Sequence, residues 1–205
     1  MNKIVLISML FIGIIGSAQD SIAIKRIISF QNDLNKKFIS EDTSPLPEKE
    51  LSSFEALEFF EINTAFSIKA KFVRTPFESP FMMKTSTESE SIYVKYGEVH
   101  FKINKIPYRL NIYQNQELKT QAEYEEYLFL PFTDLSNGIS SYIGGRYIDL
   151  TIPEGDTILI DFNTAYNPYC AYNQRYSCPM PPKENHLDLE VLAGVKKNDK
   201  YIVNN

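Results

Sequence analysis

The sequence predicts a mainly β fold: a single antiparallel β-sandwich or partly closed barrel with an N-terminal amphipathic helix packed on it. Two observations indicate this class. From residue 66 onward, apolar and polar residues alternate with a period of two in most segments, which is typical of strands with one solvated face. Apolar residues recur at three- and four-residue steps in residues 21–40, which indicates a helix.

The helix is expected to begin near Ser21, whose side chain can cap the first turn. Its apolar face consists of Ile24, Ile27, Ile28, Leu34 and Phe38. The following residues 41–53 contain two prolines among clustered polar residues, so they are expected to connect the helix to the sheet.

The strands are expected at residues 66–74, 91–96, 99–103, 108–113, 127–132, 146–152, 157–162 and 187–194. The segments between residues 91 and 113 are separated only by YGE and NKIP, so they should form an antiparallel meander of three strands. Residues 116–126 fit either a small helix or a long loop.

The first residues, MNKIVLISMLFIGIIGSAQD, have the pattern of a secretory signal peptide: one positive charge, an apolar run and then small residues. A membrane anchor is the alternative, but the run Ile4–Ile15 is shorter than the roughly 20 residues that span a bilayer. We therefore expect a signal peptide over residues 1–18, cleaved after Ala18, and a single β-rich domain over 19–205. The protein would then be exported to the periplasm or secreted, without an integral membrane segment after cleavage.

The composition excludes a typical nucleic-acid binder. The net charge is −5, and the lysines are scattered among acids and hydrophobes rather than gathered in a basic stripe. The glycines of DLSNGISSYIGGRYIDL fit neither a phosphate loop nor a dinucleotide-binding turn, because the spacing differs and no long helix follows. We expect no cofactor and no nucleic-acid partner.

The two cysteines, Cys170 and Cys178, are predicted to form a disulfide, because an exported chain matures in an oxidising environment. A redox-catalytic pair is disfavoured, since the spacing is not C-x-x-C and no helix follows. Zinc is a third alternative, with His186 as a further ligand and Asp188 or Asp161 as the fourth. Structural zinc takes more closely spaced cysteines, so no metal is expected.

Arg146 and Asp161 are the charged residues at strand ends that attract most interest. Arg146 follows a glycine turn and could pair with Asp134, Asp149 or Asp161, or hold an anionic ligand. Pairing is the favoured alternative, because acids surround it in sequence. Asp161 ends an apolar strand, where burial would raise its pKa unless a neighbour compensates.

The run NGISSYIGGRYIDL, followed by IDFNTAYNPYCAYNQRYSCPMPPKENHLDLEVLAG, resembles the C-terminal signature of the bacterial family catalogued as domain of unknown function 1684. The upstream segments FEALEFF and EYLFLPF are similar to those of its exported members, so the resemblance covers nearly all of the chain after the signal peptide. Ser136 and Ser141 are mild departures from the pattern. The resemblance implies one domain, draws attention to the polar positions between Arg146 and Asn185, and implies no activity.

Three functions are compatible with these residues. The leading hypothesis is a binding domain for a small polar or sugar-like ligand or a peptide, with a pocket formed by Arg146, Asp161, Asn163, Tyr166, Asn167 and Tyr172. A hydrolase using Asp161 or Glu184 as general acid or base is the second. The third is a structural clamp without a ligand, in which Arg146 pairs with Asp161. The sequence does not decide whether the protein is an enzyme, nor its oligomeric state.

Overall fold

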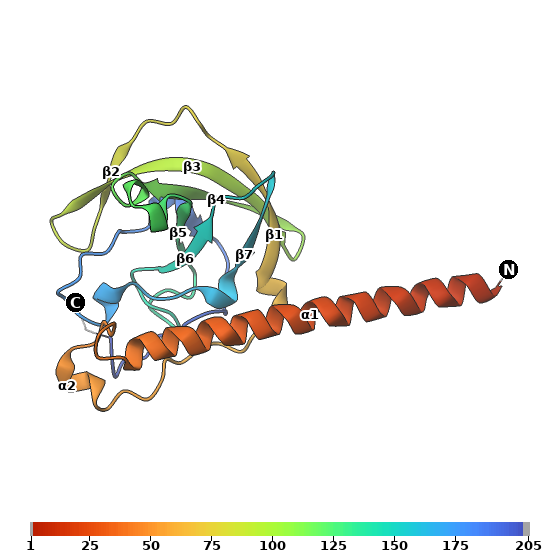
Figure 1. The fold of residues 1–205 in the computed structure, drawn as a ribbon, viewed down its shortest axis with the longest axis horizontal. Coiled ribbons are helices and arrows are strands. Elements are labelled where there is room, and N and C mark those ends of the chain that lie inside the picture. The colour runs from red at the N-terminus through yellow and green to blue at the C-terminus, as the bar shows by residue number, and fades with distance from the viewer. Residues whose placement is uncertain (1, 203–205) are drawn as a thin grey trace.

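A long helix and a curled antiparallel sheet make up most of the structure, a computed structural model that describes residues 2–202, with side chains from Asp20 onward (Figure 1). The helices are α1 (Asn2–Ile39) and the short α2 (Glu48–Leu51). The strands are β1 (Ser67–Arg74), β2 (Phe81–Lys84), β3 (Glu90–Ile103), β4 (Ile106–Asn115), β5 (Tyr127–Asp134), β6 (Arg146–Thr151), β7 (Thr157–Asp161) and β8 (His186–Leu187).

The sheet has the strand order β6-β5-β4-β3-β1-β7 and curls into a half-barrel (Figure 1). β2 pairs with β3, and β8 is parallel to β5, whereas the other pairings are antiparallel. The predicted class, a mainly β fold with an N-terminal helix, is therefore confirmed, with the partly closed form rather than a sandwich. The strand order is the part that the sequence did not predict.

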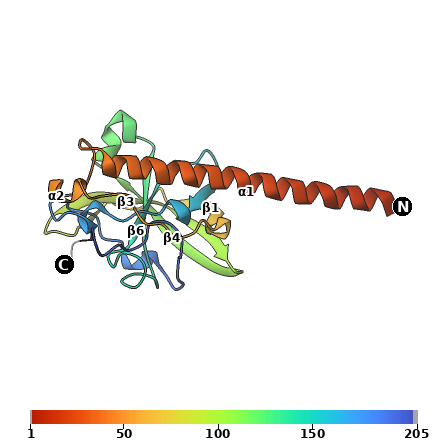
Figure 2. The ribbon, with the colours of Figure 1, turned by 90° about the horizontal axis from the view of Figure 1, so that it is seen from below.

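The helix predicted from Ser21 onward is present as the C-terminal part of α1, which continues through Ser21 without interruption. Figures 1 and 2 show the N-terminal part of α1 extending away from the sheet. The side chains of the predicted signal peptide, residues 1–18, lie outside the described part of the structure, so cleavage and export stay predictions. Within residues 20–202, whose side chains the structure describes, no helix is both long enough and apolar enough to span a membrane.

The predicted three-stranded meander is a two-stranded hairpin. Residues 91–96 and 99–103 belong to one strand, β3, whose pairing with β4 shifts between Lys95 and Gly97. Tyr96 is the extra residue of this β-bulge. Gly97 is required there, because a Cβ at this position would lie 2.5 Å from the Phe72 ring. The glycine that suggested a turn instead makes room for a neighbouring strand.

Other segments also differ from the prediction. β2 was not predicted, and the expected strand 187–194 is reduced to the two residues of β8. The segment 116–126 contains two short 3-10 turns, Leu118–Thr120 and Ala122–Tyr124, rather than an α-helix. These pieces are too short or too aperiodic to be recognised by alternation.

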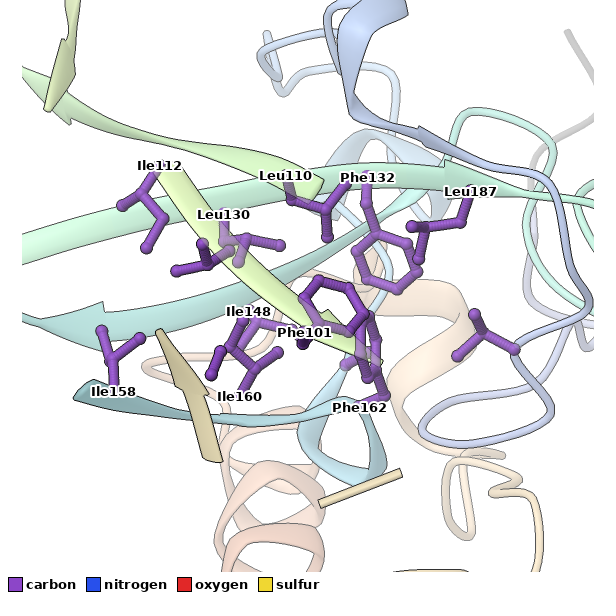
Figure 3. Packing of buried hydrophobic residues seen from close by; sticks show 14 of the residues in the cluster. Phe101, Leu110, Ile112, Leu130, Phe132, Ile148, Ile158, Ile160, Phe162 and Leu187 are labelled. Carbon is purple, nitrogen blue, oxygen red and sulfur yellow. The ribbon is translucent and has the colours of Figure 1, made fainter. Parts of the chain in front are cut away.

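The main core fills the concave side of the half-barrel (Figure 3). Alternate residues of the strands point into it: Phe101 on β3, Leu110 and Ile112 on β4, Leu130 and Phe132 on β5. The residues between them point to the opposite face, where they form a second cluster with both cysteines: Met83, Tyr93, Tyr113, Phe129, Tyr147, Cys170 and Cys178. The sheet therefore has two apolar faces, and the second is rich in tyrosine.

The C-terminal half of α1 packs on a third cluster. Leu34 and Phe38 pack in a cluster with residues of the segment that follows β7, and the Phe38 ring is edge-on to Tyr172 at a centroid distance of 4.9 Å. α1 thus lies beside the tyrosine-rich face and forms one wall of the space next to it.

Candidate functional site

Alternation on two adjacent strands places four side chains together on the second face of the sheet. Tyr127 and Phe129 on β5 lie beside Tyr147 and Asp149 on β6, and Phe129 pairs directly with Asp149. The rings of Phe129 and Tyr147 meet edge-on, with their centroids 4.7 Å apart. β5 and β6 thus present an aromatic surface that carries one carboxylate.

The segment after β7 covers this surface. Its short turns are η4 (Phe162–Thr164) and η5 (Tyr169–Ala171). Between them, Tyr166 exchanges two backbone hydrogen bonds with Tyr147, of 2.9 and 3.0 Å, and so extends the sheet by one residue. This bridge holds the Tyr166 ring edge-on to the Tyr147 ring.

Asp149 is the polar centre of the site. Its Oδ1 accepts hydrogen bonds from the hydroxyls of Tyr127, at 2.8 Å, and Tyr166, at 2.6 Å. Burial, and secondly the charge of Asp149, raises the pKa of both tyrosines above the ordinary value, so both phenols stay protonated and donate. Among the described residues, Oδ2 of Asp149 has no hydrogen-bond partner, and the side chain is exposed.

A cavity of about 300 Å³ opens in front of Asp149, which we call the tyrosine pocket. It is lined by Phe30, Leu34, Lys37, Tyr147, Asp149, Tyr166, Pro168, Tyr169, Tyr176, Ser177 and Cys178. α1 contributes Lys37, and the segment after β7 contributes most of the rings. The pocket therefore combines aromatic walls with a hydrogen-bond acceptor and an ammonium donor. Pockets for small polar ligands have this composition.

The predicted disulfide is not formed in the structure: Cys170 and Cys178 are buried free thiols. They are close neighbours, since the backbone N–H of Cys170 donates to the sulfur of Cys178 over 3.1 Å. Backbone hydrogen bonds hold the loop instead. Ser86 N–H donates to Cys178 C=O at 2.8 Å, and Met180 N–H donates to Lys84 C=O at 2.8 Å. The loop is thus anchored at β2 without a crosslink.

Arg146 does not line the tyrosine pocket. Its side chain has no exposed surface and pairs with Asp134, with Nη2 and Oδ2 2.8 Å apart. The guanidinium also donates to the carbonyls of Val191, at 2.8 Å, and Ala193. Of the alternatives that the sequence left open, the structure has the pair with Asp134. Burial lowers the pKa of Arg146, and Asp134 opposes this shift.

Asp161 and Asn163 join α1 and the segment before β1 to the end of β7. Asp161 is 5% exposed, and it accepts hydrogen bonds from Arg26 at 2.6 Å and Ser67 at 3.1 Å. The backbone and side-chain N–H groups of Asn163 also donate to Asp161. Asn163 in turn exchanges two hydrogen bonds of 2.9 Å with the backbone of Asn63. Both side chains are occupied by internal partners.

The remaining predicted residues are dispersed. Asn167 is buried and donates to the hydroxyl of Tyr172, which is buried against α1. Glu184 is exposed on the turn η6 (Lys183–Asn185). His186 is on β8, where its Nδ1 is 3.0 Å from the hydroxyl of Thr133. Only Tyr166, among the predicted ligand-binding residues, lines the tyrosine pocket.

Sequence reasoning missed most of the pocket. Asp149 was considered as a partner for Arg146 but not chosen as a site residue, and Tyr147, Tyr169 and Tyr176 were not selected. The signal that could have found them was the alternation in RYIDL. It places Tyr147 and Asp149 on the face opposite to Ile148, which is in the core.

The fold and site define a class of protein: β-rich half-barrel domains with a buried arginine–aspartate ion pair and a tyrosine-rich C-terminal segment. The chain belongs to the family described as "Protein of unknown function (DUF1684)", whose model matches residues 52–196. A solution NMR structure of an uncharacterised protein from Haloarcula marismortui is similar, with a TM-score of 0.69 and 27% sequence identity. The similarity covers 89% of this chain and 98% of that one. No curated protein matches the chain.

Proposed function

We propose that this protein is an exported domain that binds a small polar, sugar-like ligand in the tyrosine pocket. The observation that carries the proposal is the position of Asp149, a carboxylate held by two phenols in front of a cavity with aromatic walls. Rings stack on the apolar face of a sugar, and a carboxylate accepts hydrogen bonds from its hydroxyls.

The geometry favours a small ligand over a long peptide. The pocket has a volume of about 300 Å³, at the lower end of the range for ligand sites. Its walls are fixed, because Tyr147 and Tyr166 are joined through their backbones and the Tyr147 hydroxyl donates to the Pro179 carbonyl. A site arranged before binding loses little conformational entropy when the ligand arrives.

The test is a binding screen with the matched variants Asp149→Asn and Asp156→Asn. The full-length chain is titrated with monosaccharides, disaccharides and short peptides, and binding is followed by calorimetry and thermal shift. We expect one class of sugar to bind, and Asp149→Asn to weaken it by about tenfold or more, since hydrogen bonds to a charged group contribute about 1.5–3 kcal/mol.

Asp156→Asn is the control, because Asp156 is exposed in the connection between β6 and β7 and does not line the pocket. It should bind as the unmodified chain does. The proposal fails if no sugar binds, if only peptides bind, or if Asp149→Asn has no effect in a chain whose thermal unfolding is unchanged.

The structural-clamp alternative fits a different set of residues. Arg146, Asp161 and Asn163 have internal partners, and these contacts support a role in holding the C-terminal segment. The clamp and the pocket are therefore compatible proposals about separate parts of one segment. No contact of Asp161 or Glu184 favours the hydrolase alternative.

A further inference from the structure

A second cavity lies next to the two thiols. It has a volume of about 310 Å³ and is lined by Ser86, Tyr142, Ile143, Gly144, Tyr147, Pro168, Cys170, Cys178, Pro179 and Met180. Both cysteines and Met180 therefore line one small, largely apolar space.

Two hydrogen bonds hold the cysteines in place. The Cys170 N–H donates to the Cys178 sulfur, and the Ser86 hydroxyl accepts from the backbone N–H of Cys178 at 3.1 Å. The Cys170 N–H is placed to stabilise negative charge on the Cys178 sulfur and to orient it.

We propose that Cys170, Cys178 and Met180 form a binding site for Cu(I). Thiolate and thioether sulfurs are the soft ligands that select this ion. Zinc fits less well, because structural zinc takes four ligands. Within the described side chains, no cluster of three or more His, Cys, Asp or Glu residues is arranged to hold a metal. Met180 is 52% exposed, so its flexible side chain can close over an ion that has entered the cavity.

Burial distinguishes this site from a thiol–disulfide exchange centre. Cys170 and Cys178 are 7% and 8% exposed, which leaves little surface for the disulfide of another protein to approach. A small ion can reach them through the cavity. This cavity adjoins the tyrosine pocket, and Tyr147, Pro168 and Cys178 line both, whereas Cys170 and Met180 line only this one.

The experiment titrates the reduced full-length chain with Cu(I) under anaerobic conditions, in competition with a chromophoric Cu(I) chelator. We expect one ion per chain, with sulfur neighbours in the X-ray absorption spectrum. Cys170→Ser and Cys178→Ser should each reduce the affinity by about 100-fold, and Met180→Leu by about tenfold, because ligand changes weaken a metal site on this scale. Met82→Leu is the matched control, since Met82 is a half-exposed methionine on β2 outside the cavity.

Four results would overturn the proposal: no competition for Cu(I), equal binding by Cys170→Ser, no effect of Met180→Leu, or Zn(II) binding that is as tight as that of Cu(I). A native chain whose thiols are locked in a disulfide that reductant cannot open would also overturn it. Asp149→Asn should leave Cu(I) affinity unchanged, which separates failure of this site from failure of the sugar site. Thermal unfolding of each variant shows whether it is folded.

Discussion

Arg146 and Asp134 form an ion pair in which neither side chain has any exposed surface, with Nη2 and Oδ2 2.8 Å apart. The pair joins the two ends of the connection between β5 and β6. Asp134 also accepts a hydrogen bond from the backbone N–H of Val191 at 3.1 Å, so the pair fixes the C-terminal segment as well. A buried charge that loses its partner is strongly destabilising.

The first prediction concerns this pair. Arg146→Met should lower the free energy of unfolding by about 3–5 kcal/mol, because Asp134 is left buried without its counter-charge. Arg109→Met is the control. Arg109 is 53% exposed and lies 3.4 Å from Glu98, so its loss should cost about 1 kcal/mol or less. Urea denaturation measures both, and equal destabilisation by the two variants would contradict the prediction.

Gly145 provides a second prediction. Its φ of +89° is in the left-handed region, and a Cβ there would lie 2.6 Å from the carbonyl oxygen of Phe132. Gly145→Ala should therefore destabilise the protein by more than about 1 kcal/mol. At Gly155 an added Cβ meets nothing within 4 Å, so Gly155→Ala should be neutral or slightly stabilising. Equal midpoints of thermal unfolding for the two variants would show that position 145 accepts a Cβ without strain and would contradict the prediction.

Asn185 is the subject of the third prediction. Its side chain accepts from the N–H of Asn111 at 2.9 Å and donates to the carbonyls of Asn111, at 2.8 Å, and Pro131, at 2.7 Å. Asn185→Ala leaves these buried backbone groups of β4 and β5 without partners. The expected cost is about 3 kcal/mol or more in denaturant unfolding. Asn32→Ala, at an exposed position of α1, should change the stability by about 0.5 kcal/mol at most.

The fourth prediction is a loss of stability at alkaline pH. Burial raises the pKa of Tyr113 and of Tyr142 from 10.0 to about 12. In the unfolded chain these phenols lose their protons near pH 10, whereas the folded chain retains them, so the folded state binds more protons above that pH. Their contribution is complete below pH 10 and decreases as the pH rises to 12, by about 1–3 kcal/mol for each group.

The measurement for this fourth prediction is the free energy of unfolding at pH 7, 10 and 12. Tyr142→Phe should reduce the loss between pH 10 and 12, after its effect at pH 7 has been subtracted. A stability that is the same at pH 10 and 12 would show that these phenols are not desolvated in the folded state.

The fold class and most of the strands could be predicted from the sequence, because a solvated face and a buried face produce alternation. Residues 187–194 failed this criterion: their apolar residues pack on the core, but most of them do not belong to a strand. The partner of Arg146 was left open because Asp134, Asp149 and Asp161 all lie near it in sequence, and proximity in sequence does not distinguish them. Only the register of β5 with β6 brings Arg146 opposite Phe132, two residues before Asp134.

The candidate site was harder to predict than the fold. Polar residues in the signature segment look like ligand contacts in the sequence, but Asn163, Asn167 and Asn185 are buried. Their amides bind backbone groups or other side chains of the protein itself. The tyrosine pocket forms where α1 and β6 pack against the segment after β7, which is far from α1 in sequence. Local periodicity carries no information on such long-range contacts.

The bulge at Tyr96 divides β3 into two parts in which the alternation of side chains between the two faces has opposite phase. Tyr93 and Val99 are both odd-numbered, yet Tyr93 belongs to the tyrosine-rich cluster and Val99 to the core of the half-barrel. The extra residue shifts the phase of the strand between them. Deletion of Tyr96 alone would remove this shift and exchange the two faces over one half of β3. The side chains of that half that are now buried would have to point to the opposite face, although the amino acids on either side of the deletion are unchanged.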